Sequence, residues 1–216
     1  MALIERTEIF LRESFDRSRW MQNHPVDKSY RLEHSYRVAN VAGQIAEAEG
    51  MDVEGLVIGG LLHDISYSED WGSQEEWINH GRRSAQIARS FLEKSALEPE
   101  RVQEICYGIA IHVDDRADFP GEATVFARSV SDADNVDRFD VYRIYEWMYY
   151  DGFREKSLEE KENWLAGKLR WIDEQMERGA ATETARRMFE ERLNYQKEYF
   201  ARLRQQLSRS TEIGWR

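Results

Sequence analysis

Apolar residues recur at intervals of three and four along most of this chain, which is the spacing of a helix that buries one face. Residues 3–19, for example, place Ile4, Leu11 and Phe15 on one such face among many charged positions. No stretch alternates between apolar and polar residues for long enough to predict a strand. The pattern therefore predicts an all-α protein.

Typical capping residues mark the helix boundaries in the first half of the chain. Residues from about 32 to 50 carry an apolar stripe, and Gly50 is typical of a helix C-terminus. Asp52 is a typical N-cap for the next helix, which we expect to end near residues 63–64. The two glycines at 59–60 of that helix indicate close packing against a neighbour.

The remaining segments follow the same logic. We expect a loop over residues 65–78, a helix over 80–92, a helix from Pro99 to 112, a loop over 113–122 and a helix over about 124–139. Large aromatic residues then crowd residues 142–150: Tyr142, Tyr145, Trp147, Tyr149 and Tyr150. We expect them to pack in the protein core, and the alternative is that they reshape a pocket beside their helix.

Beyond Asp151-Gly152 the sequence becomes more charged. Residues 158–208 read as two long amphipathic helices that are interrupted near Gly179. We therefore predict a helical core domain over residues 1–155 and a C-terminal helical extension over 156–216. The extension either packs on the core or forms a subunit interface.

Charge and composition exclude several classes of protein. A net charge of −11 argues against a protein that coats nucleic acid, although a small phosphorylated ligand needs only a few local cations.

The single cysteine, Cys106, excludes an intrachain disulfide and fits a reducing compartment. Its spacing with Val102, Ile105 and Ile109 predicts a buried side chain. No apolar run approaches the roughly 20 residues that span a bilayer, and no signal-peptide core follows Met1, so we expect a cytoplasmic protein without membrane contact.

Four of the five histidines lie within or at the end of amphipathic segments: His34, His63, His80 and His112. One such histidine is usually structural, but several on different helices, with carboxylates nearby, are typical of a metal site in a helical bundle. Asp64 directly follows the most apolar stretch of the chain, where a carboxylate needs a partner or a cation. The alternative is that Asp64 simply begins a polar loop.

The order of these residues resembles that of the HD domain superfamily of metal-dependent phosphohydrolases. The resemblance lies in His34, then the pair His63-Asp64, then an aspartate within residues 131–134, and it extends over residues 30–140. Small bacterial and archaeal HD proteins with nucleotide pyrophosphatase-like activity also share the small-residue helix after His80 and a helix that ends in a histidine, here His112. The resemblance implies an HD-domain-like helical bundle, here followed by the C-terminal pair of helices.

The resemblance also implies a set of metal ligands. His34, His63, Asp64 and Asp134 match the ligands of the family, with Asp132 as the alternative to Asp134. His80 and His112 match two further positions of the family. The residues at those positions complete a second metal site in binuclear members and contact substrate phosphate in others. The expected cofactor is one or two divalent ions: Mn, Fe, Co, Ni, Zn or Mg.

In such a site, a metal-activated water attacks a phosphoryl group. We expect catalytic roles for Asp64, His80, His112 and Arg37, since Arg37 lies three residues after His34 and shares its helical face. Arg37, Arg82 and Arg83 are candidate phosphate-binding residues, although exposed arginines are also common on acidic helical proteins.

Three functions stay open on the sequence. The first is hydrolysis of a nucleotide or another small phosphate ester or anhydride. The second is a di-iron oxygenase, because some HD-like proteins use the same six ligands to activate oxygen. The third is a binding or scaffold protein that keeps the metal for stability. The sequence of residues 135–145 differs from that of the nucleotide pyrophosphatase-like relatives, so the resemblance does not identify the substrate. A homo-oligomer formed through the C-terminal helices is compatible with each function.

Overall fold

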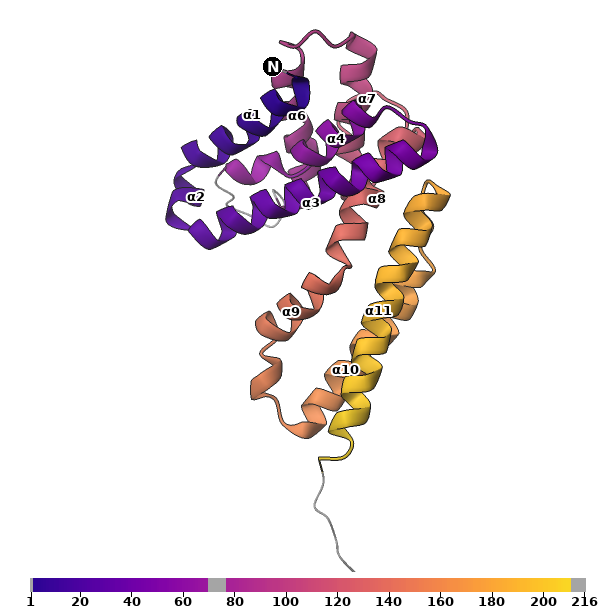
Figure 1. Ribbon diagram of the computed structural model, residues 1–216. Coiled ribbons are helices and arrows are strands. Elements are labelled where there is room, and N and C mark those ends of the chain that lie inside the picture. The colour runs from indigo at the N-terminus through magenta and orange to yellow at the C-terminus, as the bar shows by residue number, and fades with distance from the viewer. Residues whose placement is uncertain (1, 70–76, 211–216) are drawn as a thin grey trace, which may run out of the picture. The chain divides into compact units, whose positions relative to one another are not determined.

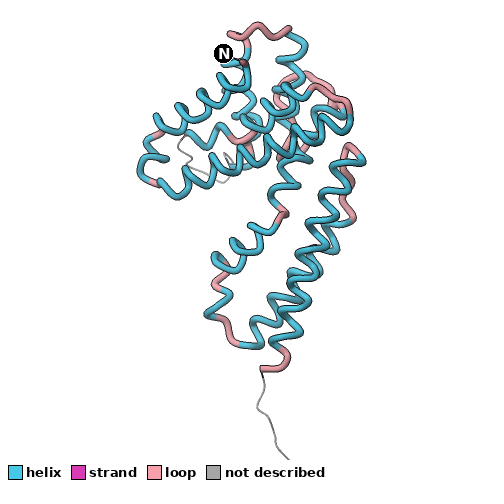
Figure 2. Tube along the Cα trace, viewed as in Figure 1, coloured by secondary structure: helices cyan, strands magenta, loops and turns pink. Residues whose placement is uncertain are grey.

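The computed structural model describes residues 2–69 and 77–210, and within these ranges every regular element is a helix (Figures 1 and 2). The all-α prediction is confirmed. The chain forms two compact units, one of residues up to Asp137 together with Ala180–Ala185, the other of Arg138–Gly179 and the chain from Arg186 onward. The predicted division into residues 1–155 and 156–216 stays a prediction, because compactness alone does not define a part that folds independently.

The first unit contains eight elements among its described residues: α1 (Leu3–Arg17), α2 (Arg19–Asn23), α3 (Pro25–Glu49), α4 (Val53–Leu62), the 3₁₀ turn η1 (Ile65–Ser68), α6 (His80–Leu92), α7 (Pro99–Ile111) and α8 (Val125–Arg138). The second contains α9 (Val141–Tyr150), the 3₁₀ turn η2 (Phe153–Glu155), α10 (Leu158–Met176) and most of α11 (Glu183–Leu207). Among the described helices, none combines the length with the apolar character that a membrane span requires.

Helices α3 and α4 are bounded by the predicted caps. Gly50 ends α3 in the left-handed region at φ 67°, and the Asp52 side chain accepts a hydrogen bond from the Gly55 N–H at 3.1 Å. The start of α3 was predicted too late, since the helix begins at Pro25 rather than near residue 32. Its first two turns are mostly polar and carry no apolar stripe, but proline is well suited to the first position of a helix.

Helices α3 and α4 cross closely, as Figure 1 shows. A Cβ atom on Gly60 would lie only 2.8 Å from the Ala39 Cα, so the contact requires glycine and confirms the predicted close packing. Around this crossing lies an apolar core in which Cys106 is also buried, as predicted; its larger members include Leu11, Phe15, Val38, Ile45, Leu56, Ile58, Leu61, Leu62, Ile65, Ile105 and Ile109.

The first residues of the loop predicted over 65–78 form a regular element instead. Residues 65–68 form η1, because Ser66 is fixed at two points by α6. Its hydroxyl donates to the His80 carbonyl at 3.0 Å, and its N–H donates to the Ser84 hydroxyl at 3.1 Å. Residues 70–76 of the predicted loop lie outside the described residues.

In the second unit, α10 and α11 run antiparallel. Arg204 of α11 pairs with Glu162 near the start of α10 at 2.8 Å, whereas Lys197 pairs with Asp173 near its end at 2.6 Å. The helices are separated by residues 177–182, so the predicted break near Gly179 is confirmed.

The aromatic residues of α9 do not all pack in the core. Tyr145, Tyr149 and Tyr150 are exposed to 60%, 67% and 72%, and Tyr142 is also exposed, so the prediction of core packing is wrong for these four. Trp147 does pack inward, against Trp171 at a ring-centroid distance of 5.0 Å. The reason is the helical period, which places positions 142, 145 and 149 on one face and position 147 on another.

Candidate metal centre

Six buried side chains from five helices of the first unit meet at one point. They are His34 from the middle of α3, His63 and Asp64 from the end of α4, His80 at the start of α6, His112 at the end of α7 and Asp134 of α8. These residues are the six that the family resemblance implied, and their separation in sequence shows that the fold of the first unit brings them together.

Hydrogen bonds donated by Nδ1 orient all four histidine rings. His63, His80 and His112 each place Nδ1 2.6–2.8 Å from the carbonyl oxygen of the residue three positions earlier. His34 places Nδ1 2.7 Å from Oδ2 of Asp137. These acceptors have no hydrogen to give, so Nδ1 carries the proton, and Nε2 of each neutral ring keeps the lone pair that binds a metal.

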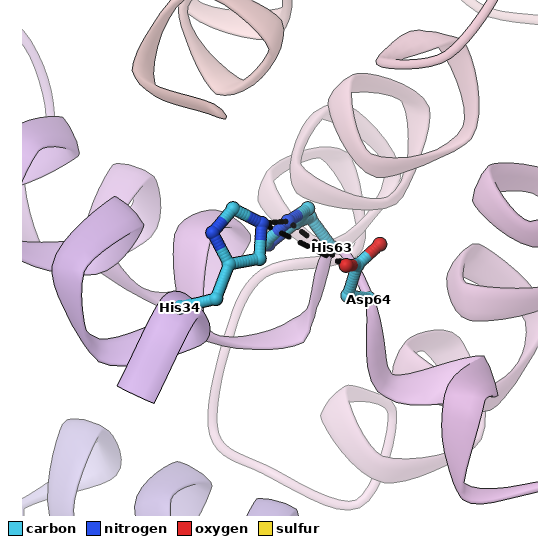
Figure 3. A group of neighbouring side chains, drawn as sticks. All are labelled: His34, His63 and Asp64. Carbon is cyan, nitrogen blue, oxygen red and sulfur yellow. Dashed lines mark hydrogen bonds and ion pairs between the residues drawn. The ribbon is translucent and has the colours of Figure 1, made fainter. Parts of the chain in front are cut away.

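Four of these residues converge at one side of the cluster (Figure 3 shows three of them). Nε2 of His34 and Nε2 of His63 lie 3.2 Å apart. Oδ2 of Asp64 lies 3.7 Å and 3.6 Å from these two nitrogens, and Oδ1 of Asp134 lies 3.2 Å and 3.8 Å from them. Two imidazole nitrogens and two carboxylate oxygens thus face a common centre.

The other oxygen of Asp64 faces a second pair of histidines. Nε2 of His80 and Nε2 of His112 lie 3.2 Å apart, and Oδ1 of Asp64 lies 3.3 Å and 3.7 Å from them. Asp64 therefore stands between the two histidine pairs with one oxygen toward each.

This donor set fits divalent metal ions. Each of three trios within the six residues has its ligand atoms within 4.8 Å of one another. Neighbouring ligands at the roughly 2.1 Å bond length of a metal–imidazole bond are about 3.0–3.4 Å apart, which agrees with the 3.2 Å between the nitrogens of each pair. Imidazole together with carboxylate suits Mn, Fe, Co, Ni and Zn.

The burial of the site separates the pKa values of its histidines. Burial lowers the pKa of His63 to about 4, so its ring is neutral. Burial also acts against a charge on His34, but hydrogen bonds with Asp134 and Asp137 outweigh it and raise the pKa of His34 to about 9. A metal ion that binds at His34 must therefore displace a proton at neutral pH.

Arg31 is a half-buried cation beside Asp64. Its Nη1 donates to Oδ2 of Asp64 at 2.8 Å, and its guanidinium lies 3.5 Å from the ring centroid of Tyr67. Burial alone would raise the pKa of the Asp64 carboxyl, but the surrounding histidines, when protonated, and the Arg31 guanidinium hold it well below its usual range.

The predicted phosphate-binding arginines are engaged with other carboxylates. Nε of Arg37 donates to Asp137 at 2.7 Å, and Nη1 of Arg82 donates to Asp114 at 2.7 Å. Arg83 pairs with Glu69 at the protein surface. Their predicted role in substrate binding stays a prediction.

The two candidate aspartates of α8 have different surroundings. Asp134 faces the histidines, whereas Oδ2 of Asp132 accepts a hydrogen bond from the Ala181 N–H at 2.7 Å. Burial raises the pKa of Asp132 to about 6. This geometry favours Asp134 as a ligand.

Sequence reasoning missed Arg31 and Asp137. Both had a signal in the helical period, since Arg31 lies three residues before His34 and Asp137 lies three residues after Asp134. A single arginine or aspartate on a charged helix is nevertheless too common to single out without the distances that the fold provides.

Comparison with known proteins places this site in a family. The model of the HD domain matches residues 31–138, which include all six residues of the cluster. A crystal structure described as a predicted HD superfamily hydrolase from an uncultured Thermotogales bacterium matches with a TM-score of 0.63 and 21% identity, covering 94% of this chain and 91% of the other. At that identity the likeness shows the fold alone.

Ribonuclease Y of Mycoplasma mycoides is 34% identical over 99 residues, which cover 42% of this chain and 23% of the relative. Ribonuclease Y of Mycoplasma capricolum is 33% identical over 99 residues, covering 42% and 19%. The chain thus spans less than a quarter of the length of these curated relatives. Since the family model matches half of the chain and contains the whole cluster, the chain belongs to the HD domain family of metal-dependent phosphohydrolases.

Proposed function

We propose that the protein hydrolyses a phosphate ester or anhydride of a small molecule such as a nucleotide. The observation that carries this proposal is the position of Asp64, which presents one oxygen to each histidine pair and lies against the Arg31 guanidinium. Such an arrangement offers two metal positions with a guanidinium beside them. Positive charges placed in this way would stabilise the negative charge that develops on a phosphoryl group during hydrolysis.

The proposed ligand assignment follows the geometry. His34, His63, Asp64 and Asp134 would hold one divalent ion, and Asp64, His80 and His112 would hold a second. When bound, such ions supply a Lewis acid and lower the pKa of a coordinated water toward about 7. The chain itself orients the imidazoles through their Nδ1 atoms and excludes bulk water from the ligands.

We assign substrate orientation to Arg31. Its guanidinium is held between the Tyr67 ring and the Asp64 carboxylate, so its position is fixed before a substrate arrives. With a divalent ion bound to Asp64, the N–H groups of Arg31 would be available to a phosphoryl oxygen. A planar guanidinium with several donors is well suited to that contact.

A small substrate is favoured over RNA. The similarity to Ribonuclease Y of Mycoplasma mycoides covers 42% of this chain and only 23% of that relative, so it does not extend to the rest of the relative. A net charge of −11 disfavours a long polyanion, which gains affinity from many basic contacts. RNA remains a useful member of the substrate panel because it tests this argument.

The same donor set also suits a di-iron oxygenase, and a metal kept only for stability would fit a scaffold protein. Arg31 favours hydrolysis over both, since a half-buried cation beside the ligands is suited to an anionic substrate. Neither alternative requires that cation.

The function can be tested with protein that has been stripped of metal and reloaded with Mn²⁺, Co²⁺, Ni²⁺, Zn²⁺, Mg²⁺ or, without oxygen, Fe²⁺. Phosphate or pyrophosphate release is measured on nucleoside mono-, di- and triphosphates, phosphomonoesters and a short RNA. We expect metal-dependent release from a small substrate without oxygen. Oxygen-dependent turnover of the iron form with no release from any substrate would establish the oxygenase instead.

Arg31→Met tests the proposed role of the arginine. We expect the metal content to be unchanged and the rate to fall about 100-fold, the effect of removing one donor to a developing oxyanion. Arg17→Met is the matched control, because Arg17 forms only an exposed pair with Glu13 one turn away among the contacts described. Equal rates for the two variants would remove Arg31 from the mechanism.

We also propose self-association through the second unit. Exposed aromatic side chains on α9 and α11, such as Tyr145, Tyr149 and Tyr195, support it, because such side chains are enriched at protein interfaces. Light scattering over a range of concentrations tests the proposal, and a monomer at every concentration would contradict it.

A further inference from the structure

One of the four histidines is oriented differently from the other three. His63 and His112 are the C-caps of α4 and α7, and His80 is the first residue of α6. The last carbonyl groups of a helix lack partners within it, so the His63 and His112 rings find a carbonyl acceptor three residues earlier. The acceptor of His80, the Trp77 carbonyl, lies ahead of α6.

His34 lies in the interior of α3, where the carbonyl groups accept hydrogen bonds from the next turn of the same helix. The Nδ1 proton of His34 therefore needs an acceptor from another element. That acceptor is Oδ2 of Asp137 at 2.7 Å, on α8 and 103 residues away along the chain.

Asp137 is itself held in place from α3. Its second oxygen, Oδ1, accepts a hydrogen bond from Nε of Arg37 at 2.7 Å, and the Asp137 side chain is only 9% exposed. Arg37 and His34 lie one turn apart on α3, so a single carboxylate of α8 bridges two neighbouring positions of that helix.

We propose that Asp137 is a positioning residue that fixes the tautomer and the orientation of His34, with Arg37 fixing the orientation of Asp137. This inference rests on the proposed metal site. The carboxylate keeps the proton of the neutral ring on Nδ1 and leaves the lone pair of Nε2 directed toward His63 and Asp134. A carboxylate behind an imidazole also makes that imidazole a stronger metal ligand.

The Arg37 contact makes the substitution Asp137→Asn informative. An asparagine side chain has one oxygen, which accepts, and one NH₂ group, which donates. Since Arg37 can only donate, it draws the oxygen to itself and turns the NH₂ group toward His34. Nδ1 must then accept, and the proton moves to Nε2, where it blocks metal binding.

The double variant Arg37→Met, Asp137→Asn removes that constraint. The asparagine can then turn its oxygen toward His34, and Nδ1 again donates. Arg37→Met alone leaves the Asp137 carboxylate beside His34. The two substitutions are therefore expected to be strongly non-additive, with the second variant restoring what the first removes.

The test uses the full chain, titrated with Zn²⁺ and with Mn²⁺ against a competing chelator, with ¹⁵N NMR of the histidine rings of the metal-free protein at a pH above the pKa of His34, which is about 9. Asp137→Asn is expected to weaken binding of the ion at His34 about 10- to 100-fold and to place the ring proton on Nε2. Arg37→Met is expected to bind within about threefold of wild type, and the double variant to recover most of the loss.

Several results would overturn the proposal: wild-type affinity in Asp137→Asn, an unchanged His34 tautomer in that variant, or a double variant no better than Asp137→Asn. If Asp137→Asn does not fold, as judged by circular dichroism, Asp137→Ala replaces it and must still weaken the ion at His34. Metal binding by wild type without phosphate release would contradict the proposed function and leave this inference intact.

Discussion

Oδ1 of Asp64 lies 3.3 Å from Nε2 of His80, so the second histidine pair shares its carboxylate with the first. The other oxygen of Asp64 faces His34 and His63. Substitutions on the two sides of this carboxylate should therefore have different effects on metal content.

His112→Ala is expected to remove one ion and to leave the other, because His112 lies on the side of Oδ1. Asp64→Ala is expected to weaken the binding of both ions by at least about 100-fold. The loss of a ligand should reduce metal affinity more than the loss of a residue that is only hydrogen-bonded to a ligand. The metal content after equilibrium dialysis measures both. Loss of both ions in His112→Ala would contradict two separable positions.

Asp134→Asn and Asp132→Asn form a matched pair on α8. We expect Asp134→Asn to lose the ion at His34, since the amide oxygen is a much weaker ligand than a carboxylate. Asp132→Asn should retain it, because its amide oxygen can still accept the hydrogen bond from the Ala181 N–H. Metal titration of the two purified variants decides between the aspartates, and the reverse order would make Asp132 the ligand.

Gly60→Ala is expected to destabilise the first unit by about 1–3 kcal/mol, because overpacking forces the backbones apart. The new Cβ would meet the Ala39 backbone at 2.8 Å. Gly167→Ala in α10 is the control, since its Cβ would meet nothing within 4 Å and should stabilise the helix by about 0.5–1 kcal/mol. Urea unfolding followed by circular dichroism measures both changes, and equal stability of the two variants would contradict the tight crossing of α3 and α4.

Cys106 should resist alkylation in the folded protein. Burial raises the pKa of its thiol to about 12, so about one thiol in 10,000 is ionised at pH 8. The reactive thiolate would increase tenfold for each unit of pH up to about 12. Mass spectrometry after treatment with iodoacetamide at pH 8 should show modification only after denaturation, whereas rapid modification of the native protein would show that Cys106 is accessible.

The helices and the six residues of the cluster could be predicted because they follow from local signals. Helical spacing and caps such as Gly50 and Asp52 depend on a few neighbouring residues, and the order of the histidines carried the family resemblance. The start of α3 was placed too late because the residues after Pro25 have no apolar stripe, although they continue the helix.

The residues that hold the metal ligands in position could not be predicted in the same way. Arg31 contacts Asp64 across 33 positions, and Asp137 contacts His34 across 103, so their roles depend on how separate helices pack. The tyrosines of α9 show the same limit, because Tyr145 and Tyr149 share a helical face whose exposure is decided by the neighbouring elements.

The most direct test of the metal-dependent hydrolysis proposed here is the transfer of ¹⁸O from labelled water into the released phosphate. The metal-loaded protein is incubated without oxygen in H₂¹⁸O, with Asp64→Ala as the control. We expect each phosphoryl group that water attacks to gain one ¹⁸O atom, whether it leaves as phosphate or stays on the other product. Asp64→Ala is expected to reduce release about 1,000-fold, which corresponds to several kcal/mol of metal-ion stabilisation. Release that is equal in Asp64→Ala, or turnover that requires oxygen and yields no labelled phosphate, would contradict the account.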